Sequence, residues 1–167
     1  MKSMIATLTA ATLLSLPALA SPMKTMEAGD EHGMEADEHA IKSSIGQPWS
    51  SAPDRQIDVI LTESDQGMIF KPGQVDVEAG EAIRFVLRNE GVLDHEFVIG
   101  TAESNTAHAM EMMDDPDMVH ESANAKRVPT GASASLQWQF TEAGTYEYSC
   151  SIPGHREAGM VGTILVK

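Results

Sequence analysis

The feature that most constrains the fold is a run of three metal-ligand side chains close to the C-terminal end of the chain. Cys150, the only cysteine in the sequence, is followed by His155 and then by Met160 at equal intervals. A thiolate, an imidazole and a thioether are ligand types that suit copper. Pro153 and Gly154 lie between the first two residues and predict a turn. The run therefore predicts a loop that directs three side chains at one point.

The residues on both sides of this loop have the pattern of β-strands. In residues 145–150, Tyr146, Tyr148 and Cys150 share one face, and residues 161–166 form the next predicted strand. The cysteine then ends a strand and points into a hydrophobic interior. A thiolate or an uncoordinated imidazole is costly in such a place, whereas a bound cation keeps the thiol deprotonated.

A second histidine comes from a different predicted strand, residues 93–99. His95 shares a face of that strand with Phe97 and Ile99, so it also points inward. Two imidazoles, one thiolate and a weak axial thioether make up the ligand set of blue-copper sites. We therefore predict one copper ion, held by His95, Cys150, His155 and Met160.

Residues 55–167 contain several further strand patterns. Hydrophobic and polar residues alternate in short segments that are separated by glycine and proline turns. Many short strands of this kind indicate an all-β fold, either an antiparallel β-sandwich or a small barrel. These additional strands are predicted at residues 55–62, 67–70, 74–77, 83–87 and 135–140.

The segment 55–167 resembles the cupredoxins, the plastocyanin and azurin family. The resemblance rests on Asp94-His95-Glu96-Phe97 and on the run from Cys150 to Met160. It implies a Greek-key β-sandwich, with copper near one end and His155 close to the surface as the electron port. Many cupredoxins have asparagine after the first histidine, where it ties the two ligand loops together, whereas this chain has Glu96. That departure affects the stiffness of the site, and hence its colour and potential, because neighbouring bonds tune such metals.

Alternative kinds of site fit these residues less well. A binuclear copper centre needs a second cysteine in the loop, and structural zinc usually takes four cysteine or histidine ligands without methionine. Copper oxidases and nitrite reductases need additional histidine-rich sites, for which the chain is too short. A buried structural thiol is the alternative without a metal. We expect the protein not to be an enzyme.

The first 20 residues have the features of a secretory signal peptide. Lys2 gives a positive start, residues 4–19 are mostly hydrophobic, and Ala18-Leu19-Ala20 has the small-x-small form of a cleavage site. The hydrophobic run is too short to span a bilayer, and no later segment is hydrophobic enough. We therefore expect cleavage before Ser21 and export to the periplasm.

The charge of the exported chain limits its partners. Without Lys2, 10 basic residues face 25 acidic ones, which gives a formal charge of 10 − 25 = −15. Such a chain repels nucleic acid but attracts cations and basic protein surfaces. We expect a monomer that binds copper ions and meets a transient redox or copper-trafficking partner, without nucleic acid and without a membrane span.

Two segments contain methionine and histidine residues that the strands do not require. Residues 21–54 are acidic and lack periodicity, so we expect a flexible arm. In the connection 101–130, Asn105 is predicted to cap a helix that runs through Met113 and ends at Pro116. Thioether sulfur favours Cu(I), although methionine-rich segments also form adaptable contact surfaces. The candidate accessory copper ligands are Met23, Met26, His32, Met34 and His39 in the arm, and His108, Met110, Met112, Met113, Met118 and His120 in the connection.

These observations predict an exported mononuclear type 1 copper protein that cycles between Cu(II) and Cu(I). The extra methionine and histidine residues make the chain similar to periplasmic cupredoxins of bacterial copper tolerance, so copper handling is the leading hypothesis. The alternative is a soluble electron-transfer shuttle between redox partners, which meets them through small transient contacts. A cuprous oxidase is less favoured, because it needs substrate access or an open copper position.

Overall fold

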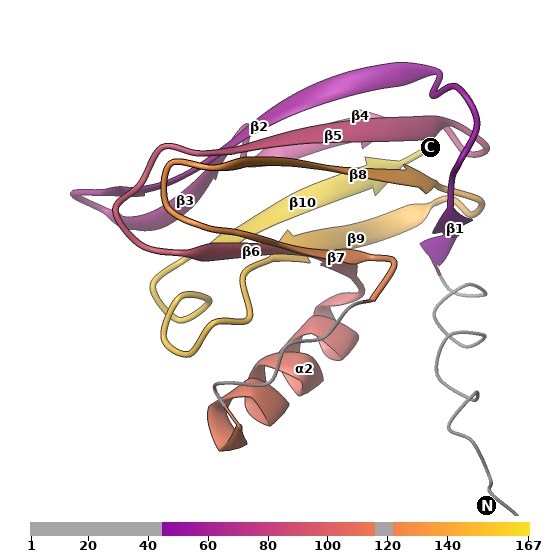
Figure 1. The fold of residues 1–167 in the computed structure, drawn as a ribbon. Helices are drawn as coiled ribbons and strands as arrows, with labels where there is room; N and C mark the ends of the chain where they lie inside the picture. The colour runs from indigo at the N-terminus through magenta and orange to yellow at the C-terminus, as the bar shows by residue number, and fades with distance from the viewer. Residues whose placement is uncertain (1–44, 116–121) are drawn as a thin grey trace, which may run out of the picture. The chain divides into compact units, whose positions relative to one another are not determined.

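The computed structural model describes residues 45–115 and 122–167, and these residues form two five-stranded β-sheets that pack face to face (Figure 1). The first sheet has the order β1-β8-β5-β2-β3, and the second has the order β4-β10-β9-β6-β7. The predicted all-β sandwich is confirmed. The strands of the first sheet are β1 (Gln47–Pro48), β2 (Arg55–Ser64), β3 (Gly67–Lys71), β5 (Ala82–Asn89) and β8 (Ser133–Gln139). Those of the second are β4 (Gln74–Val77), β6 (His95–Gly100), β7 (Ala125–Val128), β9 (Gly144–Ser149) and β10 (Val161–Val166).

Two strand pairs are parallel, which the prediction of an antiparallel sandwich did not include. β2 pairs with β5 and β4 pairs with β10 in parallel, and the other pairs are antiparallel. The chain crosses from the first sheet to the second between β3 and β4. Because of this crossing, β5 returns to the first sheet in the same direction as β2.

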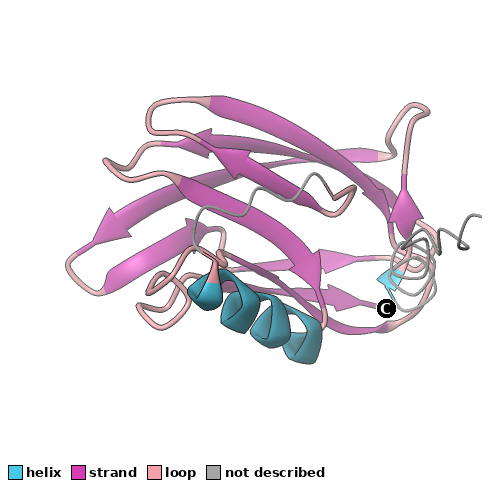
Figure 2. Cartoon of the chain, turned by 60° about the horizontal axis from the view of Figure 1, so that its bottom comes forward, coloured by secondary structure: helices cyan, strands magenta, loops and turns pink. Residues whose placement is uncertain are grey.

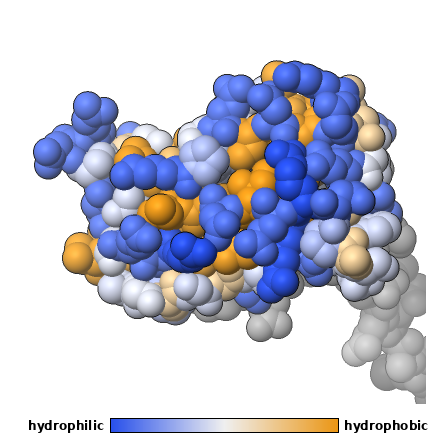
Figure 3. Space-filling model, turned by 90° about the horizontal axis from the view of Figure 1, so that it is seen from above, coloured by the Kyte–Doolittle hydropathy of each residue, from blue (hydrophilic) through white to orange (hydrophobic). Residues whose placement is uncertain are grey.

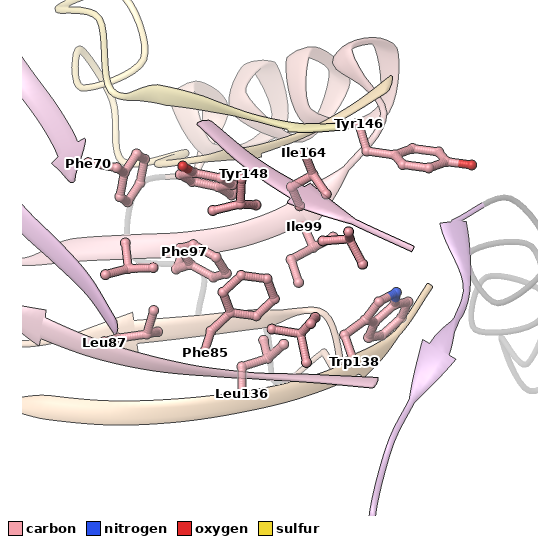
Figure 4. Close-up of a cluster of buried hydrophobic side chains, with 14 of the residues drawn as sticks. Phe70, Phe85, Leu87, Phe97, Ile99, Leu136, Trp138, Tyr146, Tyr148 and Ile164 are labelled. Atoms are coloured by element: carbon pink, nitrogen blue, oxygen red, sulfur yellow. The ribbon is translucent and has the colours of Figure 1, made fainter. Parts of the chain in front are cut away.

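Alternating hydrophobic side chains from both sheets fill the core. β5 buries Phe85 and Leu87 and exposes Arg84. The ring of Phe85 lies 5.2 Å from that of Phe97 in the facing sheet, and Phe97 stacks on Tyr148 at 5.1 Å (Figure 4). Such aromatic pairs contribute about 0.5–1.5 kcal/mol each beyond the area they bury. Seen from the side of β2 and β5, the surface is largely hydrophilic, with hydrophobic residues between (Figure 3).

The packed domain begins before residue 55, so the prediction of an arm that extends to residue 54 is wrong at its C-terminal end. Ile45 is buried, and its carbonyl oxygen accepts a hydrogen bond from Trp138 Nε1 at 3.2 Å. β1 then pairs with β8. A strand of two residues is too short to show alternation, which is why the sequence did not reveal it. The predicted signal peptide and residues 21–44 of the arm lie outside the described residues.

Helix α2 (Ala102–Asp114) packs on the outer face of the second sheet, against β6 and β9 (Figures 1 and 2). Its N-cap is Thr101 rather than the predicted Asn105. Ser104 N donates to Thr101 Oγ1 at 3.0 Å, and Thr101 N donates to Ser104 Oγ at 2.9 Å, which forms a capping box. Asn105 is buried instead, and its side-chain amide donates to Val98 O at 3.4 Å. Pro116 lies outside the described residues.

None of the helices in the described parts of the chain has the length and hydrophobicity that crossing a membrane requires.

Candidate metal centre

Three predicted ligands come together where β6 begins and β9 ends. The ligand atoms of His95, Cys150 and His155 all lie within 4.8 Å of one another. His155 Nδ1 is 3.3 Å from His95 Nδ1 and 3.4 Å from Cys150 Sγ. His95 and Cys150 are 0 % exposed and His155 is 7 % exposed, so His155 is the one nearest to solvent. The two ligand segments, which are far apart in the sequence, therefore form one buried cluster.

Backbone hydrogen bonds fold the loop after Cys150 back toward the cysteine. Cys150 N donates to Met160 O at 3.1 Å, and Met160 N donates to His155 O at 3.0 Å. Gly154 and Gly159 have φ values of +86° and +96°, a backbone region that favours glycine. The fourth predicted ligand, Met160, is 0 % exposed and its backbone contacts both other ligand residues of the loop. The loop thus holds Met160 next to the cluster.

Burial keeps the ligand side chains neutral in the absence of a cation. It raises the pKa of the Cys150 thiol to about 12, against the opposing effect of N–H groups from Glu96 and Ile152. It also lowers the pKa of His95 and of His155, and the neighbouring His95 lowers the pKa of His155 further. Neutral imidazoles are ready to bind a metal, whereas the thiol must first lose its proton.

The donor set fits copper. Two imidazole nitrogens and one sulfur converge in a buried site, and a methionine lies beside them on the loop. Glu96 N donates to Cys150 Sγ at 3.3 Å, a contact that favours the thiolate over the thiol. This mixture of soft and intermediate ligands is the one expected for a blue-copper ion.

Sequence reasoning missed Glu63, which contacts the outer nitrogen of His95. Glu63 Oε1 is 3.0 Å from His95 Nε2, and the same carboxylate accepts hydrogen bonds from Val92 N at 2.9 Å and Leu93 N at 3.1 Å. Partial burial raises the pKa of Glu63, but the hydrogen bonds outweigh it and the pKa is lowered overall. Glu63 precedes His95 by 32 positions and sits near the end of a strand, so no spacing motif marks it.

Glu96, the residue that departs from the family pattern, faces helix α2. It is buried, and its Oε2 lies 3.9 Å from His108 Nε2. Oε2 has no hydrogen bond among the described residues. At this position the backbone supports Cys150 while the side chain lies under the helix.

The accessory copper candidates of the connection 101–130 lie in different environments. Met112 is buried in α2 at 2 % exposed, whereas Met110 and Met113 are 64 % and 61 % exposed. His108 lies beside Glu96 and is not part of the three-residue cluster. Met118, His120 and the five candidates of the arm lie outside the described residues.

Comparisons with known proteins also support copper binding. Residues 57–167 match the family described as copper binding proteins, plastocyanin/azurin family. The chain is 42 % identical over 159 residues to the copper-resistant cuproprotein CopI of Rubrivivax gelatinosus, which covers 93 % of this chain and 94 % of that protein. It is 37 % identical over 154 residues to the copper-resistant cuproprotein CopI of Pseudomonas aeruginosa, covering 74 % and 83 % of the two chains.

Solved structures show the same fold. Auracyanin B superposes with a TM-score of 0.62 at 22 % identity, over 72 % of this chain and 94 % of that chain. An azurin from Methylomonas sp. strain J gives a TM-score of 0.53 at 16 % identity, over 68 % and 98 %. The predicted resemblance to cupredoxins is confirmed. The chain belongs to the plastocyanin/azurin family of copper-binding proteins, and copper is its cofactor.

Proposed function

We propose that the protein is exported to the periplasm, binds one copper ion in a type 1 site and cycles between Cu(II) and Cu(I) as part of copper handling and tolerance. The buried cluster of His95, Cys150 and His155 carries the proposal, with Met160 as the weak axial ligand. The relatives named copper-resistant cuproproteins support tolerance as the purpose of binding. The expected signal peptide supports export.

The chain's own residues explain how the site works. Bound copper supplies one-electron redox chemistry. His95 begins β6 and Cys150 directly follows β9, so two paired strands position these side chains. His155 is the ligand nearest to solvent, which makes it the place where an electron partner comes closest. With the other ligands fully buried, we propose no enzymatic turnover.

We also propose that the connection 101–130 provides accessory copper ligands. His108 lies beside the carboxylate of Glu96, and Met110 and Met113 present thioethers to solvent. Imidazole and thioether ligands suit copper. Titration of the full chain with Cu(I) should find more than one copper per chain, and His108→Ala should reduce that number while Cys150→Ala removes a different equivalent. A stoichiometry of one in the unmodified chain would contradict this proposal.

A growth experiment tests the function. A strain that lacks the gene should be sensitive to copper, the unmodified gene should restore growth, and the Cys150→Ala gene should not. Slowed respiration at ordinary copper levels, with copper tolerance unchanged, would instead support the electron-transfer shuttle. Catalytic oxygen consumption with Cu(I) as substrate would support a cuprous oxidase.

A further inference from the structure

We propose that Glu63 is a positioning residue for His95 and that its charge biases the copper site toward Cu(II). Nothing in the sequence pattern marks Glu63, which belongs to the first sheet while His95 belongs to the second. The inference rests on the ligand role proposed above for His95.

The hydrogen bonds of Glu63 fix the orientation of the imidazole. Its carboxylate accepts from the N–H groups of Val92 and Leu93, so it is tied to the loop that leads into β6. Glu63 Oε1 lies 3.0 Å from His95 Nε2. An ionised carboxylate only accepts hydrogen bonds, so Nε2 carries the proton of the neutral imidazole. Nδ1 is then left with its lone pair, and Nδ1 is the atom that lies 3.3 Å from His155 Nδ1 in the cluster.

The negative charge also affects the balance between oxidation states. A carboxylate that accepts the outer N–H of a ligating histidine makes the imidazole a stronger donor. Cu(II) carries one more positive charge than Cu(I), so a nearby anion stabilises Cu(II) more. The Glu63 side chain is 25 % exposed, and solvent weakens this effect without removing it. Glu63 therefore favours the oxidised site.

Gly91 leaves room for this carboxylate. A Cβ atom added at Gly91 would meet both carboxylate oxygens of Glu63, within the loop that precedes His95. The backbone at Gly91 does not have a positive φ, and the three atoms nearest to the added Cβ all belong to Glu63. Gly91→Ala therefore displaces the carboxylate while it keeps the charge.

Three variants test the proposal. In Glu63→Gln, removal of the charge should weaken Cu(II) binding about 10- to 100-fold. The preference for Cu(II) over Cu(I) should fall about tenfold, which raises the reduction potential by about 59 mV for one electron. Gly91→Ala should shift both quantities in the same direction by a smaller amount. Glu81→Gln is the matched control. Glu81 also accepts hydrogen bonds from a backbone N–H and from a side chain, but its partners are Glu78 N and Arg55 Nε rather than the loop before β6 and His95.

The tautomer of His95 gives a readout that does not need copper. Nitrogen-15 chemical shifts of His95 in the metal-free protein should show a proton on Nε2, and this preference should weaken in Glu63→Gln. The Glu63 and Gly91 variants could instead lose stability as the Glu81 control does, with the reduction potential and the His95 tautomer unchanged. Glu63 would then only stabilise the loop before β6, and the proposal would be wrong. Gly91→Ala decides the question if Glu63→Gln does not fold. Absence of a copper–thiolate band in the unmodified protein would instead contradict the proposed ligand set.

Discussion

At the scale of single residues, Cys150 determines the chemistry of the site. Copper needs the thiolate form of this side chain, whereas burial favours the protonated thiol. Burial raises the pKa of the thiol to about 12, and it lowers the pKa of both His95 and His155. Around neutral pH the protein therefore offers a protonated thiol and two neutral imidazoles. A bound cation favours the thiolate over the thiol at Cys150, and the two imidazoles stay neutral.

Copper binding should therefore release one proton per ion. Protons compete with copper for Cys150, so the apparent affinity should rise about tenfold for each unit of pH from about 6.5 to 8.5. Competition titrations with a chelator across this range, together with proton release measured by a pH indicator, check the slope. An affinity that does not change with pH would show that the thiol is already ionised or is not a ligand.

As the proposed weak axial ligand, Met160 should tune the potential rather than decide whether copper binds. In Met160→Gln, a hard amide oxygen replaces the soft thioether, and hard ligands favour the higher oxidation state. We expect copper to be retained at one per site and the reduction potential to fall. Potentiometric titration of the variant beside the unmodified protein measures the shift. An unchanged potential would remove Met160 from the ligand set.

The sequence predicted the three residues that the structure brings together, but it did not mark Glu63, which contacts one of them. Cys150, His155 and Met160 follow one another at short range in a single loop, so their chemistry was visible in the spacing. Glu63 acts through the packing of two sheets, and a glutamate near the end of a half-buried strand looks like any solvated residue. Its role depends on tertiary contacts that no local pattern encodes.

At the scale of secondary-structure elements, helix α2 packs against the outer face of β6 and β9. Its first turn is held by the capping box of Thr101 and Ser104. Thr101→Ala should lower the free energy of unfolding by about 1 kcal/mol, because an N-terminal N–H group of the helix loses its acceptor. Urea denaturation measures the change. Met110→Ala is the control, since Met110 lies in the same helix, is exposed and caps nothing. Equal losses in both variants would mean that the cap contributes nothing specific.

Alternation explains why most strands were predicted and why β1 and β7 were not. β5 and β9 alternate inward and outward residues over six or more positions, which gives a clear period of two. β7 has four residues, with charged Lys126 and Arg127 in the middle, and follows a long connection. β1 has only two. Such short strands form because neighbouring strands offer free backbone N–H and C=O groups. The residues of a short strand do not show which neighbour it will pair with.

For the domain as a whole, the segment before β2 belongs to the packed structure. Ile45 is 2 % exposed and packs in the same core as Trp138 and Phe140. Ile45→Ala should lower the free energy of unfolding by about 2–5 kcal/mol, because it leaves a cavity in the core. Val92→Ala is the control; Val92 is 80 % exposed, and a change there should stay within about 0.5 kcal/mol. If Ile45→Ala were as stable as the control, residues 45–54 would belong to the predicted flexible arm rather than to the packed domain.

The sandwich brings Cys150 and two histidines together in one buried cluster, which we propose holds one copper ion. The most direct measurement is the visible absorption spectrum of the Cu(II)-loaded protein beside that of Cys150→Ala at the same copper content. The unmodified protein should show an intense thiolate-to-copper band, and the variant should lack it. A colourless Cu(II) protein, or a band that survives the loss of Cys150, would contradict the claim.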